Sequence, residues 1–226
     1  MDFEIILTVL MGIGLSAAGG FRIFIPFLIL SIASLTGNLE LADSFNWIGT
    51  IPALVTFGAA TIFEIAGYYI PWIDNALDTI ASPIAVIAGI ILMASVVTGV
   101  SPLLKWVLVV VAGGGVAGAF QALTGLTRIT SSLTTGGLGN PAISTVESGS
   151  SITLAVLSIF IPLIAGIIVI ALLIWAAKIL INRFTAKSKA SSYKTHHKPN
   201  EANYVISLDY FHRAYCWNLS QIPYAW

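Results

Sequence analysis

Residues 148–177 read SGSSITLAVLSIFIPLIAGIIVIALLIWAA and contain no charged side chain. A second segment, TIASPIAVIAGIILMASVVTGVSPLL at residues 79–104, is also free of charge. Each is longer than the roughly 20 residues that a helix needs to cross about 30 Å of hydrocarbon. In the whole chain only 9% of residues are charged, against about 25% in an ordinary soluble domain. The sequence therefore predicts a protein integral to the lipid bilayer.

The hydrophobic segments predict an all-α polytopic fold, because backbone polar groups in lipid must be satisfied within helices. Five hydrophobic units follow one another along the chain, at about residues 3–35, 48–70, 80–100, 106–133 and 152–181, with a polar turn at 72–78. The first unit would be about 50 Å long as one straight helix, too long for the bilayer. We expect it to break at Gly19, Gly20 and Pro26.

The fourth unit is rich in glycine, and we expect it to be broken as well. Gly136, Gly137 and Pro141 predict irregular backbone at its end, which is tolerated at membrane depth only where protein or a wet cavity surrounds it. An exposed loop is the alternative for this segment.

The chain divides into a membrane domain at residues 1–182 and a tail at residues 183–226, which is first basic and then aromatic and which we expect to be flexible. A shift of 99 residues aligns similar small-residue patterns in the two halves of the membrane domain. This favours an inverted repeat that relates residues 5–70 to residues 105–181, as in many transporters. The alternative is that small residues recur wherever membrane helices pack closely.

The orientation follows from the basic residues that gather after the last hydrophobic unit: Lys178, Arg183, Lys187, Lys189, Lys194 and Lys198. The charged residues in the loops at residues 36–48 and 71–79 are all acidic. Lysine and arginine near membrane helices remain on the cytoplasmic side. We therefore expect the helices to lie in the inner membrane and the C-terminal tail to lie in the cytoplasm.

Arg22 and Glu64 lie well inside hydrophobic segments. An unpaired charge there costs at least about 2.5 kcal/mol, so each needs a partner or water. They either line a polar pathway for an ionic solute or pair with each other and hold two helices together.

Other polar residues extend this candidate pathway. Arg128 shares a helix face with polar residues that can bond to a neighbouring helix or to a ligand, namely Thr124, Ser131 and Ser132. Its side chain could instead reach the membrane surface. Asp74 and Asp78 are four residues apart, a spacing that suits a cation or a proton relay as well as a helix cap. The remaining candidates are Asn140 and Glu147.

Three segments resemble the signature segments of an uncharacterised bacterial membrane family, domain of unknown function 4126. They are GGFRIFIP at residues 19–26, FEIAGYYIPWIDNALD at 63–78 and TGGLGNPAISTVE at 135–147. The resemblance covers roughly residues 5–182 and implies a multi-helix inner-membrane protein without an assigned activity. The family often has Asp-Lys where this chain has Tyr68 and Tyr69, which weakens any role for a charge there.

Two classes of function remain after these observations. The first is a transporter or channel-like protein for a small anionic or zwitterionic solute, which broken helices and intramembrane charges favour. The second is a non-transporting scaffold or lipid-handling protein, in which the same charges join helices and glycine stripes form a homo-oligomer interface. The hydrophobic units lack His and Cys, so we expect no enzyme, metal site or cofactor. The zero net charge argues against nucleic acid.

Overall fold

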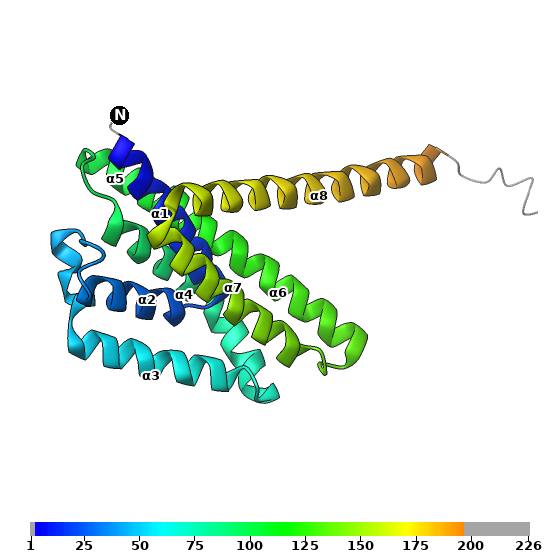
Figure 1. Cartoon of the computed structure of the whole chain (residues 1–226). Helices are drawn as coiled ribbons and strands as arrows, with labels where there is room; N and C mark the ends of the chain where they lie inside the picture. The colour runs from blue at the N-terminus through cyan, green and yellow to red at the C-terminus, as the bar shows by residue number, and fades with distance from the viewer. Residues whose placement is uncertain (1–2, 197–226) are drawn as a thin grey trace, which may run out of the picture. The chain divides into compact units, whose positions relative to one another are not determined.

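The structure, a computed structural model, describes residues 3–196, apart from the side chains of residues 71–79, 180 and 182–196. Its elements are all helical (Figure 1): α1 (Phe3–Phe21), α2 (Phe24–Leu35), the 3-10 helix η1 (Asp43–Gly49), α3 (Ile51–Gly67), α4 (Pro71–Val96), α5 (Pro102–Leu108), the π-helix η2 (Val109–Gly114), α6 (Gly115–Thr135), α7 (Asn140–Phe160) and α8 (Pro162–His196). Within this range, four helical segments are long and apolar enough to cross a membrane, or five if η1 and α3 form one bent span. The predicted all-α membrane fold is confirmed.

The chain forms two units, Met1–Leu173 and Ile174–Trp226. The first contains every contact discussed below. In the second, the described part is the C-terminal portion of α8, and the aromatic part of the tail lies outside the described residues.

The first hydrophobic unit breaks between α1 and α2, but not at the glycines. Gly19 and Gly20 lie inside α1, and the break falls at Arg22 and Ile23. Pro26 explains this position, because a proline has no N–H for the carbonyl of the residue four before it, here Arg22, and its ring clashes with that carbonyl. The last bond of α1 therefore runs from the Arg22 N–H to the Ala18 carbonyl, at 3.0 Å.

Glycines bring α1 close to its neighbours α4, α6 and α7. A Cβ atom on Gly20 would lie 2.6 Å from the Ala117 carbonyl oxygen, and one on Gly19 would lie 2.9 Å from the Leu92 side chain. The two glycines predicted as helix breakers are thus packing positions, where small residues let membrane helices approach.

Two further sequence expectations are wrong. Residues 72–78, predicted as a polar turn, lie in α4, which begins at Pro71 because proline is preset for the first position of a helix. The unit at residues 152–181, predicted as one helix, is interrupted at Ile161 between α7 and α8. Pro162 is the physical reason, since it cannot bond to the Ser158 carbonyl.

The fourth unit also differs from the expected broken helix. Helical structure is continuous from α5 through η2 to α6, and the glycine-rich part adopts the wider π-helix at Val109–Gly114. Gly113 lies in this π-helix against α4, where its Cβ would be 2.7 Å from the Gly89 carbonyl oxygen. The glycines therefore permit a close helix crossing and leave the helix unbroken.

Polarity is distributed as expected for a protein in lipid. The polar side chains of Ser16, Ser144 and Ser151 are at most 1% exposed, whereas Phe63 is 77% exposed and Leu133 82% exposed. Large apolar side chains face outward and small polar ones join the helices inside, which is how helices associate in a bilayer.

Candidate functional site

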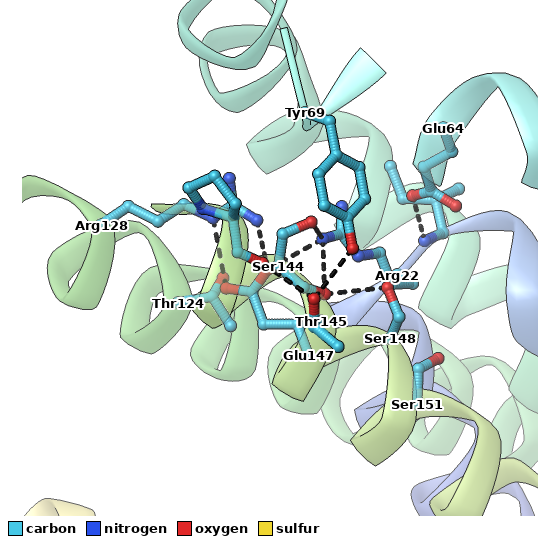
Figure 2. Close-up of polar contacts among 12 residues, drawn as sticks. Arg22, Glu64, Tyr69, Thr124, Arg128, Ser144, Thr145, Glu147, Ser148 and Ser151 are labelled. Carbon is cyan, nitrogen blue, oxygen red and sulfur yellow. Dashed lines mark hydrogen bonds and ion pairs between the residues drawn. The ribbon is translucent and has the colours of Figure 1, made fainter. Parts of the chain in front are cut away.

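The buried charges meet where the α1–α2 break lies against α6 and α7. Glu147 of α7 accepts from two arginines (Figure 2). Arg128 of α6 donates to it through Nε, at 3.2 Å from Oε1, and through NH2 to Oε2. Arg22 places its NH2 3.2 Å from the same Oε2. One carboxylate therefore joins a cation on α6 to a cation at the break between α1 and α2.

Arg22 is the most deeply buried member of this cluster, with 0% of its side chain exposed. Its NH2 donates to the Ser144 carbonyl at 3.1 Å and to the Ser144 hydroxyl at 2.5 Å. Its Nε and NH1 have no acceptor among the residues that the structure describes. An unsatisfied buried donor costs about 1–3 kcal/mol, and more when it is charged.

Tyr68, at the C-terminal end of α3, contacts both arginines through its ring. The guanidinium carbon of Arg22 lies 3.8 Å from the ring centroid and that of Arg128 lies 4.2 Å from it. Such contacts are worth about 0.5–2 kcal/mol each, the larger value applying away from water. An uncharged residue thus contacts two buried cations at once.

Glu64 of α3 has a different role from the ion pair considered above. Its Oε1 accepts from the Ile23 N–H at 2.7 Å and its Oε2 accepts from the Phe24 N–H at 3.1 Å. These are backbone donors at the start of α2, which have no partner within that helix. Glu64 therefore caps α2 from another helix, and its negative charge suits the positive end of the helix dipole. Arg22 takes Glu147 as its ion-pair partner instead of Glu64.

Two polar stripes position the cluster, one on each helix of the α6–α7 hairpin. The buried polar residues of α6 are Gln121, Thr124, Arg128 and Ser131, and those of α7 are Asn140, Ser144, Glu147, Ser151 and Ser158. Steps of three and four residues place each set on one helix face. The α7 stripe could have been found in the sequence, where it would have added Ser144 to the candidates. Tyr68 carries no comparable signal.

The other predicted breaks lie in the turn between α6 and α7 and at the start of α7. Gly136 and Gly137 have φ angles of 64° and 88°, a region that glycine adopts without strain. Pro141 lies in the first turn of α7, where proline is tolerated. Asn140 donates to the Ser132 hydroxyl at 3.2 Å, so it joins α7 to α6.

Other polar residues near Tyr68 in the chain are Tyr69 and the predicted site residues Asp74 and Asp78. Asp74 and Asp78 lie in the first turns of α4, and their side chains are outside those described. Tyr69, which neighbours Tyr68, shares a hydrogen bond of 2.8 Å with the Thr145 hydroxyl on α7. Figure 2 shows the Tyr69 hydroxyl pointing to Thr145 beside the charged cluster.

A cavity of about 320 Å³ lies beside the cluster, among α2, α3 and α4. Its lining is formed by Ile23, Phe24, Ala60, Phe63, Glu64, Tyr68, Ile80, Ala81 and Ile84. Only Glu64 and Tyr68 in this lining carry polar side-chain atoms. The volume is at the lower end of the roughly 300–1,000 Å³ of small-molecule sites.

Comparison with curated proteins and with solved structures finds no match. The family model described as domain of unknown function (DUF4126) matches residues 9–183. The match includes all three segments on which the sequence resemblance rests, together with Arg22, Glu64, Arg128 and Glu147. Since it extends over most of the chain, the protein belongs to the family of domain of unknown function 4126.

Proposed function

We propose that the protein is a transporter or channel-like protein for a small anionic or zwitterionic solute that binds at Arg22. One observation carries the proposal: the guanidinium of Arg22 is fully buried, yet Nε and NH1 have no acceptor in the described part of the chain. A carboxylate or phosphate oxygen would satisfy both atoms, because the planar guanidinium matches such groups with parallel hydrogen bonds.

The surrounding charges favour an anion. Glu147 is shared by two arginines, and Glu64 directs both oxygens to backbone N–H groups. Glu147 therefore pairs with Arg22 but is shared with Arg128, and Glu64 is engaged by the backbone of α2. A solute anion would complete the coordination of this cation without a new protein group. The two N–H groups at the start of α2 would remain capped by Glu64 during binding.

The three charged residues predicted to line a pathway, Arg22, Glu64 and Arg128, lie close to one another. This supports the proposal, because charges that only held helices together could be scattered over the fold. Arg22 and Arg128 share Glu147, and Glu64 bonds to the residue after Arg22. The arginines are at most 3% exposed, as we would expect if the site is closed in an alternating-access cycle. Breaks in helices at such a site are typical of transporters.

Solute flux into proteoliposomes tests the proposal. Purified full-length protein is supplied with a panel of small anions and zwitterions, with and without a proton gradient. We expect Arg22→Gln to lower flux at least about tenfold, a loss of about 1.4 kcal/mol of binding. Arg22→Lys, which keeps the charge but not the planar fork, should retain part of it. Lys105→Gln on α5 is the control and should transport normally.

Access to the site gives a second measurement, independent of the solute chosen. Cys216, the lone cysteine, is first replaced by serine, and a cysteine is placed at Ser144. We expect Ser144→Cys to react with a small anionic thiol reagent and Ala155→Cys, a fully buried core position on the same helix, to resist it. If folded protein moves no member of the panel and both cysteines resist, the transport proposal is wrong.

The second candidate is a membrane scaffold or lipid-handling protein. It is favoured by the number of helices that Glu147 joins, since the same ion pairs would hold α6 and α7 against the α1–α2 break whether or not a solute binds. In that case Arg22→Gln would lower the stability of the protein while no solute would protect Ser144→Cys from the reagent.

The proposed location is the inner membrane of a bacterial cell, with the tail in the cytoplasm. The basic cluster after residue 177 supports this orientation, because basic residues near membrane helices remain inside.

A further inference from the structure

The apolar cavity and the unsatisfied face of Arg22 are neighbours. Tyr68 lines the cavity and its ring centroid lies 3.8 Å from the guanidinium carbon of Arg22. Ile23, the residue after Arg22, also lines the cavity. Tyr68 therefore lies both on the cavity and against the Arg22 guanidinium, and a turn of its side chain is the movement that the inference below requires.

The cavity itself is suited to an apolar group. Phe24, Phe63 and Ile84 contribute to its walls, and Glu64 is occupied by the start of α2. Phe63 is 77% exposed and Ile80 is 55% exposed, so the cavity opens on the face that apolar side chains cover. A hydrocarbon chain can enter from that side past the apolar side chains of Phe63 and Ile80.

We infer that the solute is an amphiphilic anion, whose carboxylate or phosphate head binds Arg22 and whose apolar chain occupies the cavity among α2, α3 and α4. The inference rests on the proposed function and narrows its substrate class. Charge and hydrocarbon are recognised by different walls of one site. Turning Tyr68 away would lose its contacts with Arg22 and Arg128, and the head group would replace the contact with Arg22 by a charged hydrogen-bonded pair.

A solute without a chain fits the observations less well. It would satisfy Arg22 but leave about 320 Å³ of apolar space beside it unfilled. Each methylene that a chain buries there from water is worth about 0.8 kcal/mol, or about fourfold in affinity. Dodecanoate should therefore bind at concentrations at least about tenfold below those of butyrate.

Photolabelling of the full-length protein in nanodiscs tests this inference. The probe is dodecanoate with a diazirine at the end of its chain, and labelled peptides are located by mass spectrometry. We expect labels near Phe63 and Ile84, competed by dodecanoate and by dodecyl phosphate, weakly by butyrate or inorganic phosphate, and not by dodecanol. The alcohol has the same chain without the charge, so it separates the site from the lipid-facing surface.

Paired variants give the structural control. Ala60→Phe places a ring in the cavity and should abolish the competed labelling, whereas Ala59→Phe, at the neighbouring exposed position of α3, should preserve it. Equal competition by dodecanol would overturn the inference, because the charge would then play no part. Labelling that persists in Ala60→Phe would overturn it as well, because the chain would lie elsewhere.

Protection of Ser144→Cys separates this inference from the proposed function. If butyrate protects the cysteine as well as dodecanoate does, the site takes a small anion and the inference about the chain is wrong. If neither anion protects the cysteine and neither is transported, the proposed function fails together with the inference.

Discussion

At the scale of single residues, Glu147 is the carboxylate on which both buried arginines depend. Arg128 binds it with two hydrogen bonds and Arg22 with one ion pair. Breaking a buried pair by removing one partner is strongly destabilising, since the remaining charge keeps its desolvation cost. Loss of Glu147 takes the carboxylate from Arg22 and two hydrogen bonds from Arg128, whereas after loss of Arg128 the Glu147 carboxylate still pairs with Arg22.

We therefore expect Glu147→Gln to lower the free energy of unfolding by about 3–5 kcal/mol, and Arg128→Gln to lower it less. The measurement is a thermal or denaturant unfolding curve in detergent. The double variant Arg128→Gln/Glu147→Gln should be more stable than the sum of the single losses predicts. Glu40→Gln, an exposed change, should stay within about 0.5 kcal/mol of the wild type. Additive losses in the Arg128 and Glu147 cycle would contradict the pairing.

Glu64 gives a second residue-scale prediction, on the cap of α2. Glu64→Gln keeps the shape of the side chain, but its amide nitrogen cannot accept from the Phe24 N–H. We expect a loss of about 1–2 kcal/mol, in the range of helix-cap removals, seen as a lower unfolding midpoint in detergent. A cycle with Arg22→Gln should show a much smaller coupling than the one between Arg128 and Glu147, because Arg22 and Glu64 do not form an ion pair. A larger coupling would show that they do.

The sequence indicated which charges are buried but not which ones pair. Arg22, Glu64, Arg128 and Glu147 stand out because a charge in a hydrophobic segment is costly. Their partners depend on how helices that are distant in the sequence pack against each other. Ser144, which bonds to Arg22, lies 122 residues after it, and the residue pattern within one helix does not show which other helix it contacts. Tyr68 was missed for the same reason, since an aromatic residue at a helix end usually belongs to the membrane interface.

At the scale of elements, prolines set the breaks and glycines set the distances between helices. Pro26 and Pro162 lie just after the two breaks, at Arg22–Ile23 and at Ile161. The sequence could predict the first break but displaced it to the glycines, because glycine either weakens a helix or lets another backbone approach it. Packing decides between these two roles, and packing is not visible in one sequence.

The crossing of α4 with η2 and α6 provides the element-scale prediction. A Cβ on Gly89 would lie 2.4 Å from the Ala117 Cβ and 2.5 Å from the Gly113 carbonyl oxygen. Gly89→Ala should therefore destabilise the protein by about 1–3 kcal/mol or more. Gly125→Ala on α6 meets nothing within 4 Å and should stabilise it by about 0.5–1 kcal/mol through helix propensity. Unfolding curves of both variants in one detergent give the comparison. Equal effects would mean that this crossing is looser than the structure has it.

At the scale of the whole molecule, the break at Ile161 changes the expected topology. One helix over residues 152–181 would place the turn at residues 136–139 and the tail on opposite sides of the membrane. Instead, α7 and the first part of α8, Pro162–Ile179, are each long and apolar enough to cross. Two crossings return the chain to the side on which it started.

We therefore predict that a reporter inserted between Gly137 and Leu138 reads the same side as a reporter at the C-terminus, and that both read the cytoplasm. Leu138 is 88% exposed, so the insertion does not disturb a packed residue. The side follows from the basic cluster after residue 177, because lysine and arginine near membrane helices are retained inside. Paired reporters active in the cytoplasm and in the periplasm at each site give the measurement. Opposite sides would mean that α7 and α8 cross only once between them, and a periplasmic tail would overturn the orientation itself.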